Sequence, residues 1–163
     1  LYTDLNREED SGAFRQKLRA LDGAMNNYSA VFLLEYWGTR ILLPGDTNRL
    51  GYDGISPEDL RAHLFKVGHH GQRDGADEDL IRMVRPRGAV CCASSDRRYQ
   101  SAHPELLRLL SDSGADLWFS DCPQLPGLDL PPHQALVFSI GAEGLFTAEY
   151  TAREGANTYE TAI

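Results

Sequence analysis

The apolar positions of the chain follow two different periodicities in alternating segments. Five short segments are rich in Val, Leu, Phe, Ala and Tyr, as strands are; they are 28–36, 40–44, 64–67, 89–93 and 117–120. Three other segments begin with Pro or near acidic residues and carry apolar residues at helical spacing; they are 57–62, 76–84 and 104–113. We therefore expect strands and helices to alternate through the middle of the chain.

The two ends of the chain have a different character. Residues 1–25 are expected to form a polar linker and a helix over 11–21. Residues 134–140 and 145–150 are two further apolar segments joined by a short Gly-containing turn, which predicts a hairpin. The tail 151–163 is polar and is expected to be disordered.

The order of strands and helices predicts an α/β domain over residues 26–150, in which helices cover at least one face of a sheet. In such sheets, ligands bind beyond the carboxyl ends of the strands. Asp46, the pair His69-His70 and Ser94 each follow a predicted strand closely. We therefore expect these polar side chains to meet at one edge of the sheet.

Asp46 and the pair His69-His70 carry the side chains at this edge that suit a metal ion. A carboxylate oxygen and a neutral imidazole nitrogen together suit zinc, manganese or iron. Gly45 lets the backbone turn sharply beside Asp46, which would place the carboxylate at a rigid strand end. An ordinary turn carboxylate is the alternative for Asp46. No histidine precedes His63, so upstream residues of this chain cannot add histidine ligands.

Composition limits the class of protein. A chain of 163 residues with 42% hydrophobic content can bury one core. A net charge of -8 argues against a general nucleic-acid coat but not against a metal-dependent phosphodiesterase, because metal ions supply positive charge at the phosphate. The 3 cysteines form no disulfide framework, so we expect buried thiols in a reducing compartment such as the cytoplasm. No stretch approaches the roughly 20 apolar residues of a membrane span.

Several short motifs occur in a recognisable order. They are Asn27-Tyr28-Ser29, LLPGDT at 42–47, FKVGHHG at 65–71, Tyr99, His103-Pro104 and Ser120-Asp121. In this order they resemble the C-terminal half of a metallo-β-lactamase-fold hydrolase. Within that superfamily the chain is most similar to the hydrolase domain of the competence protein ComEC and its soluble relatives, including phosphorylcholine esterases. The resemblance covers residues 26–150.

The resemblance implies a fold and a metal centre. The superfamily fold is a four-layer αββα sandwich, and its common chemistry is metal-dependent hydrolysis. Asp46 matches the aspartate that bridges two metal ions, and His70, in preference to His69, matches the last histidine ligand. The expected cofactor is a pair of zinc ions, with manganese as an alternative.

The resemblance also implies residues on the substrate side of the centre. His69 and His103 are expected to polarise or orient a phosphate during catalysis, and Asn27, Ser94 and Tyr99 are expected to contribute to substrate binding. The expected substrate is a phosphodiester, although a small ester or lactam is not excluded by the motifs. His103 has a second interpretation as the cap of the helix that follows it.

The chain departs from the family in one major respect. The family motif HxHxDH and one further histidine, which precede the aspartate, are absent. The chain therefore resembles half of a metallo-β-lactamase domain. Three explanations remain open: a piece of a longer protein, a missing half supplied by another chain, or loss of the site. We expect no significant turnover from the 163 residues alone.

The alternative function belongs to a different class. The same fold could persist as a non-catalytic interaction or regulatory module, with Asp46 and His70 free of metal. The adjacent Arg97-Arg98 has two interpretations, a phosphate contact or a solvated loop. His63 and His133 are expected to be ordinary surface histidines, His63 at the end of a helix.

Overall fold

The computed structural model describes residues 16, 20 and 24–151. The predicted helix over 11–21 therefore lies outside the described residues, except for Gln16 and Ala20, which have helical backbone. The predicted tail also lies outside them beyond Thr151. Within the described ranges, no helix combines the length and the apolar character needed to cross a membrane.

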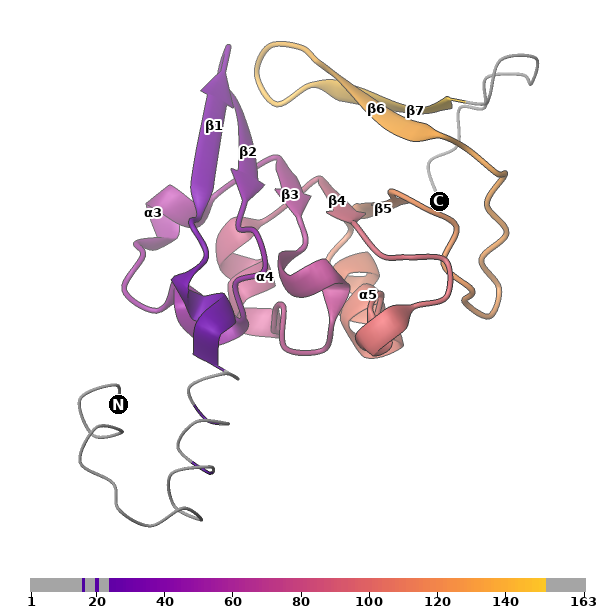
Figure 1. Cartoon of the computed structure of the whole chain (residues 1–163). Helices are drawn as coiled ribbons and strands as arrows, with labels where there is room; N and C mark the ends of the chain where they lie inside the picture. The colour runs from indigo at the N-terminus through magenta and orange to yellow at the C-terminus, as the bar shows by residue number, and fades with distance from the viewer. Residues whose placement is uncertain (1–15, 17–19, 21–23, 152–163) are drawn as a thin grey trace.

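A five-stranded mixed sheet is the centre of the structure (Figure 1). Its strands, in spatial order, are β1 (Phe32–Tyr36), β2 (Thr39–Leu43), β3 (Leu64–Lys66), β4 (Gly88–Cys91) and β5 (Asp116–Phe119). The pair β1 and β2 is an antiparallel hairpin, whereas β2 to β5 are parallel. The α/β class and all five predicted strands are thus confirmed. The first strand starts later than predicted because Met25–Tyr28 forms the 3₁₀ helix η1.

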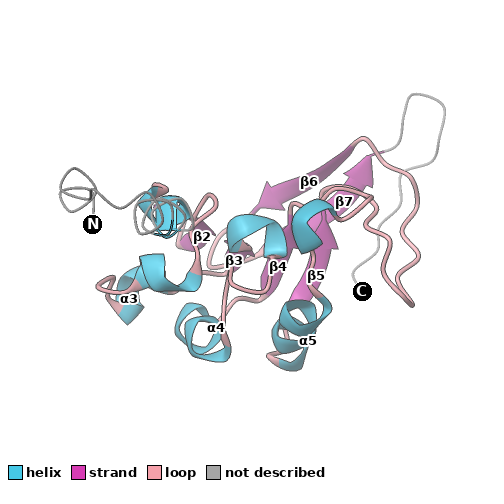
Figure 2. Cartoon of the chain, turned by 60° about the horizontal axis from the view of Figure 1, so that its bottom comes forward, coloured by secondary structure: helices cyan, strands magenta, loops and turns pink. Residues whose placement is uncertain are grey.

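Helices connect the parallel strands and cover one face of the sheet (Figure 2). They are α3 (Pro57–Leu60), α4 (Glu78–Val84) and α5 (Pro104–Asp112). Local chemistry sets where α3 and α4 begin: Ser56 Oγ accepts a hydrogen bond from Asp59 N, and the Asp77 carboxylate accepts one from Leu80 N. Helix α3 ends before His63, which instead lies in the connection directly before β3.

The main core lies between the sheet and these helices. It contains side chains from β2, β3 and β4, from the three helices and from the loops between them; its most deeply buried large members are Leu42, Tyr52, Leu60, Phe65, Val67, Leu80, Val84, Leu106 and Leu110. The alternation of side chains along each strand explains why Leu42 and Phe65, which are register partners, share the helix-facing side.

A separate hairpin, β6 (Ala135–Ile140) and β7 (Phe146–Thr151), lies on the opposite side of the sheet from the helices (Figure 2). Trp118 of β5 makes edge contacts with Phe138 and Phe146, with ring centroids 5.5 and 5.8 Å apart. The Tyr150 hydroxyl accepts a hydrogen bond from Phe119 N at 3.1 Å. The predicted hairpin is confirmed, and it covers this face over β5.

The same face is open over β1 and over the end of β2 that carries Leu43, whereas the β6–β7 turn covers Thr39 of β2, whose hydroxyl donates to the Gly141 carbonyl and accepts from Gly144 N. The antiparallel register puts Phe32, Leu34 and Tyr36 on the face opposite the helices, since Leu33 between them packs against the main core. Phe32 is 64% exposed, Leu34 51% and Tyr36 50%. We call Phe32, Leu34, Tyr36 and the partly exposed Leu43 the β1–β2 apolar face.

Candidate metal centre

Asp46 lies in a tight turn just beyond β2. Thr47 is fully buried, and its N–H and hydroxyl both donate to the carbonyl of Pro44, which fixes the turn around Asp46. Gly45 has a φ of +63°, a left-handed conformation that glycine adopts without cost. The carboxylate of Asp46 is therefore held at the carboxyl end of β2 and is still 45% exposed.

His69 and His70 lie in a left-handed turn just beyond β3. The 3₁₀ helix η3 (Gly68–Gly71) has φ values of 46° at His69, 53° at His70 and 71° at Gly71. Left-handed backbone costs an ordinary residue about 1–2 kcal/mol. Long-range bonds hold the turn: Ala102 N and the Cys91 thiol donate to the His70 carbonyl, and His103 N donates to the Gly71 carbonyl. Such strain persists only where the surrounding structure enforces it.

The turn directs the His70 ring toward Asp46. His70 Nδ1 lies 2.7 Å from the carbonyl oxygen of Cys92, which can only accept, so the ring must donate a proton there. His70 Nε2 lies 3.3 Å from Asp46 Oδ1. With the Nδ1 proton committed, the Nε2 lone pair and the carboxylate repel each other unless a proton or a cation lies between them. The predicted pairing of Asp46 with His70 is thus present in the structure.

The separation of 3.3 Å between His70 Nε2 and Asp46 Oδ1 fits a bound metal ion as well as a shared proton. Two ligands that are each about 2.0–2.1 Å from a tetrahedral zinc ion are about 3.3–3.4 Å apart. A histidine ligand also usually donates its second ring N–H to a carbonyl or carboxylate, as His70 does to Cys92. The described residues contain no group of 3 or more His, Cys, Asp or Glu side chains placed to hold a metal. Asp46 and His70 by themselves would therefore be an incomplete set of zinc ligands.

The adjacent His69 has different partners. Its Nδ1 is 2.9 Å from the Asp74 carboxylate, and its Nε2 is 3.0 Å from the side-chain amide nitrogens of both Asn26 and Gln72. The amides donate, so Nε2 accepts and Nδ1 carries the proton that Asp74 accepts. Both ring nitrogens of His69 are thus occupied by protein groups. Its predicted catalytic role remains a prediction that would require breaking these bonds.

The other predicted site residues separate into two groups. Ser94 and Tyr99 line the same cleft as His70, a cavity of about 420 Å³. His103 caps α5, with Nδ1 accepting from Glu105 N at 3.3 Å, which agrees with its second interpretation. Asn27 Oδ1 is buried against Gly51 and does not line the cleft.

Sequence reasoning missed three contributors to this region. Lys66 Nζ donates to the Gly45 carbonyl at 2.8 Å and lies 4.0 Å from Asp46 Oδ1, so it joins the ends of β2 and β3. A lysine within an apolar strand was a signal for it. The Cys92 carbonyl and Asp74 gave no comparable signal, because their roles depend on how the chain folds back.

Cys91 is a structural residue in this region. It is 1% exposed, and burial raises the pKa of its thiol to about 12. A neutral thiol is a poor metal ligand, and this one is closed off from solvent. Its thiol instead donates to the His70 carbonyl at 3.3 Å.

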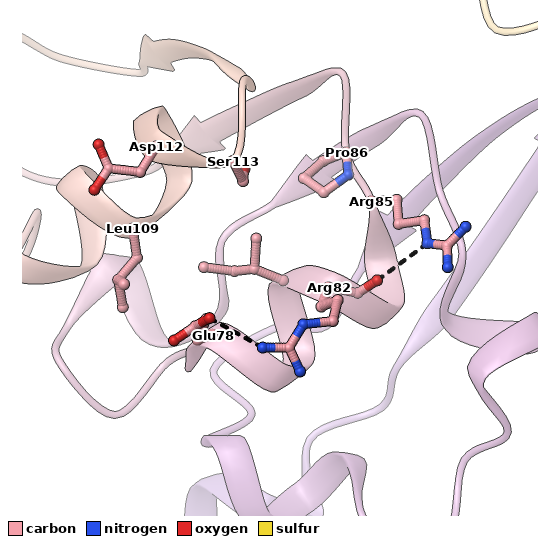
Figure 3. A pocket seen from close by; sticks show the side chains of 8 residues that line it. Glu78, Arg82, Arg85, Pro86, Leu109, Asp112 and Ser113 are labelled. Carbon is pink, nitrogen blue, oxygen red and sulfur yellow. Dashed lines mark hydrogen bonds and ion pairs between the residues drawn. The ribbon is translucent and has the colours of Figure 1, made fainter.

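A larger groove lies elsewhere, between α4 and α5. It has a volume of about 550 Å³ and includes Ile81, Arg82, Pro86 and Leu109 (Figure 3). Arg82 is paired with Glu78 at 3.0 Å, and none of the described lining residues is a histidine or cysteine. The groove therefore lacks the chemistry found around His70.

Part of the chain is similar in sequence to a known bacterial protein. A segment of 87 residues, 52% of this chain, is 32% identical to ComE operon protein 3 of Bacillus subtilis (strain 168). The similarity covers only 11% of that protein. No protein-family model matches the chain. The chain is thus a partial homologue of a ComE protein, which is consistent with the resemblance to ComEC-like proteins at that coarse level.

Proposed function

We propose that this chain contributes Asp46 and His70 to the metal centre of a metallo-β-lactamase-like hydrolase acting on a phosphodiester. The observation that carries the proposal is the His70 ring, which donates through Nδ1 to the Cys92 carbonyl and presents Nε2 to Asp46 at 3.3 Å. The residue types suit zinc, and manganese is an alternative. A bound metal ion of this kind would activate water and polarise the phosphoryl oxygen.

The chain's own residues would position that chemistry. Asp46 and His70 would hold the ion, the Cys92 carbonyl would keep the imidazole oriented, and Lys66 would keep the two strand ends together through the Gly45 carbonyl. His103 and Tyr99 remain candidates for contact with the substrate. The complete centre, with a pair of ions, requires ligands beyond the described residues.

We further propose that the part of the enzyme that supplies those ligands packs on the β1–β2 apolar face. An antiparallel pair that faces solvent normally carries polar side chains on that face, whereas β1 carries apolar ones, and β6 and β7 cover only part of this side of the sheet. A second sheet on this face would complete an αββα sandwich. It would also bury Phe32 and Leu34, which are more than half exposed.

Metal titration of the purified 163-residue chain tests the proposal. We expect saturable Zn²⁺ binding by isothermal titration calorimetry, weakened at least about tenfold in His70→Ala and in Asp46→Ala. The factor is a lower bound, since loss of even an outer partner typically costs about 10- to 100-fold in metal affinity. His133→Ala, a partly exposed histidine outside the cleft, serves as the control and should bind as the wild type does.

Two results would contradict the proposal. Equal Zn²⁺ affinity in His70→Ala and the wild type would show that the ion binds elsewhere. No saturable binding of either Zn²⁺ or Mn²⁺ by the wild type would favour the alternative, a non-catalytic interaction module.

A further inference from the structure

The cleft beside His70 has the composition of an anion site. Its polar lining includes one guanidinium, several hydroxyl groups and one carboxylate; these belong to Arg98, Ser94, Tyr99, Ser101, Ser120 and Asp121. The Asp121 carboxylate already accepts two backbone N–H bonds, from Ser95 and Cys122, at 3.0 and 2.8 Å. The carboxylate offers no donor to an anion. Among the described residues, the terminal nitrogens of the guanidinium and the hydroxyl groups of Tyr99, Ser101 and Ser120 donate to no protein acceptor, whereas the Ser94 hydroxyl already donates to Asp96.

The Arg98 guanidinium is held in place by one carboxylate, and its terminal amino groups have no partner among the described residues. Its Nε donates to Asp96 Oδ2 at 2.7 Å, and the same carboxylate accepts from Ser94 Oγ at 2.7 Å through its other oxygen. Asp96 thus holds Arg98 and Ser94 side by side. A guanidinium has five N–H donors, and among the described residues only Nε has a partner. The terminal amino groups remain available for a bidentate contact with phosphate.

Ser101 adds a buried hydroxyl without a partner. The residue is 3% exposed, and its Oγ has no hydrogen-bond partner in the described part of the chain. Buried polar side chains nearly always have a partner, so an orphan hydroxyl in the wall of a cleft suggests a group that is supplied by a ligand.

The loop that carries these residues is strained and presents Tyr99 to solvent. Tyr99 is 84% exposed. Of the nine non-glycine residues with positive φ in the described ranges, six lie in this loop and in the His70 turn; they are His69, His70, Arg97, Tyr99, Gln100 and Ala102. Strain of this kind concentrates at ligand-binding and catalytic loops. An exposed aromatic ring at the rim of a cleft also offers a stacking surface for a planar group.

We propose that Arg98 and Ser101 form a phosphoryl-binding subsite, in which Ser94 holds the Asp96 carboxylate against Arg98, and that Tyr99 stacks on a planar organic group of the same phosphoester. The inference rests on the proposed function, because the cleft shares His70 with the Asp46–His70 pair. It assigns substrate recognition to residues that hold no metal. The negative net charge of the chain suits such local recognition of one phosphate better than binding along a polyanion.

Binding experiments without metal test this subsite separately from the metal centre. The probes are inorganic phosphate and adenosine 5′-monophosphate, added to the full chain in the presence of a chelator and followed by ¹H–¹⁵N NMR. We expect saturable shifts of the Ser94, Arg98 and Ser101 amides. Potassium chloride at matched ionic strength should give no such shifts.

The variants separate the two parts of the subsite. Arg98→Gln should weaken the binding of both probes about 10- to 100-fold, because it removes a charge-assisted contact with the phosphate. Arg108→Gln, a matched change on the exposed side of α5, should leave both affinities unchanged. Tyr99→Leu should weaken the binding of the nucleotide at least about fivefold, which is within the range for loss of one stacked base. The affinity for inorganic phosphate should stay unchanged.

Three outcomes would overturn the proposal: no saturable shift with either probe, equal affinities in Arg98→Gln and the wild type, or unchanged nucleotide affinity in Tyr99→Leu. Any of them can occur while Zn²⁺ still binds Asp46 and His70, and loss of Zn²⁺ binding can occur while phosphate binding persists. The two proposals can therefore fail independently.

Discussion

At the scale of single residues, His69 and His70 show how position decides role. Both have left-handed backbone, yet the side chain of His69 is 17% exposed and bonded through both nitrogens, whereas that of His70 is 49% exposed and faces Asp46. The identical residue type and similar backbone strain make them a matched pair. They differ in whether protein groups bond to both ring nitrogens, as in His69, or hydrogen-bond only to Nδ1, as in His70.

Alanine substitutions at these two positions should therefore differ in stability. His69→Ala leaves Asn26, Gln72 and Asp74 without their shared partner. Unpaired, partly buried polar groups cost about 1–3 kcal/mol, and that is the expected loss in free energy of unfolding. His70→Ala should cost less than about 1 kcal/mol, the typical net value of one hydrogen bond. Urea denaturation measures both, and equal losses would contradict this account.

Gly71 is a second residue whose effect can be predicted. Its φ is +71°, and a Cβ at this position would collide with Cys91 Sγ. Gly114 has a φ of +85° but open space around it, so it isolates the conformational cost. We expect Gly114→Ala to lose about 1–2 kcal/mol of unfolding free energy. Gly71→Ala should lose about 1–3 kcal/mol more, from overpacking. A smaller loss for Gly71→Ala than for Gly114→Ala in chemical denaturation would refute the steric argument.

At the scale of elements, His63 links β2, β3 and the β6–β7 hairpin. Its Nδ1 accepts a hydrogen bond from Arg40 N at 3.0 Å, and its ring packs against Gly144 in the turn between β6 and β7. The sequence predicted a surface histidine at the end of a helix. The structure instead places it between two β elements, because α3 ends at Leu60.

The surroundings of His63 predict that the folded chain loses stability at acidic pH. Burial, together with the nearby charges of Arg87, Arg40 and Arg61, lowers the pKa of His63 below its ordinary value of 6.5. As pH falls below 6.5, the unfolded chain takes up this proton before the folded chain does, so His63 lowers the stability progressively until its folded pKa is reached. An NMR titration should give a pKa below 6.5 for His63 in the folded chain. A pKa at or above that value would contradict the prediction, and His63→Gln should remove this part of the pH dependence.

At the scale of the whole molecule, the exposed β1–β2 apolar face is the main departure from an ordinary surface. Edge strands with exposed apolar side chains promote association. We therefore expect the chain alone to self-associate as its concentration rises, as measured by sedimentation velocity. Replacing Phe32 and Leu34 together with lysine should suppress the association and change stability by no more than about 0.5 kcal/mol per site, the usual limit for surface positions.

A neighbouring residue provides the control for this prediction. Leu33 points to the other face of β1 and packs against the main core. Leu33→Lys should therefore destabilise the fold markedly, because it places a charge among apolar side chains. A wild-type chain that stays monomeric at every concentration tested would show that the face needs no partner.

The sequence by itself determined the elements, their order and the α/β class. Apolar periodicity and caps such as Ser56 and Asp77 act over a few residues, so they can be recognised without the fold. Asp46 and the pair His69-His70 were also identified, because each closely follows a strand in a parallel sheet and their proximity follows from that rule.

Only the tertiary structure decided which histidine faces Asp46, that Cys92 orients it, and that Arg98 and Ser101 share its cleft. These relations join residues far apart in the chain and depend on left-handed backbone at non-glycine positions, which local propensity does not favour. The exposure of Phe32 and Leu34 was likewise undetermined by the strand pattern. An apolar strand is equally compatible with a covered or an uncovered face, and only the positions of the helices and of the β6–β7 hairpin decide which face is left open.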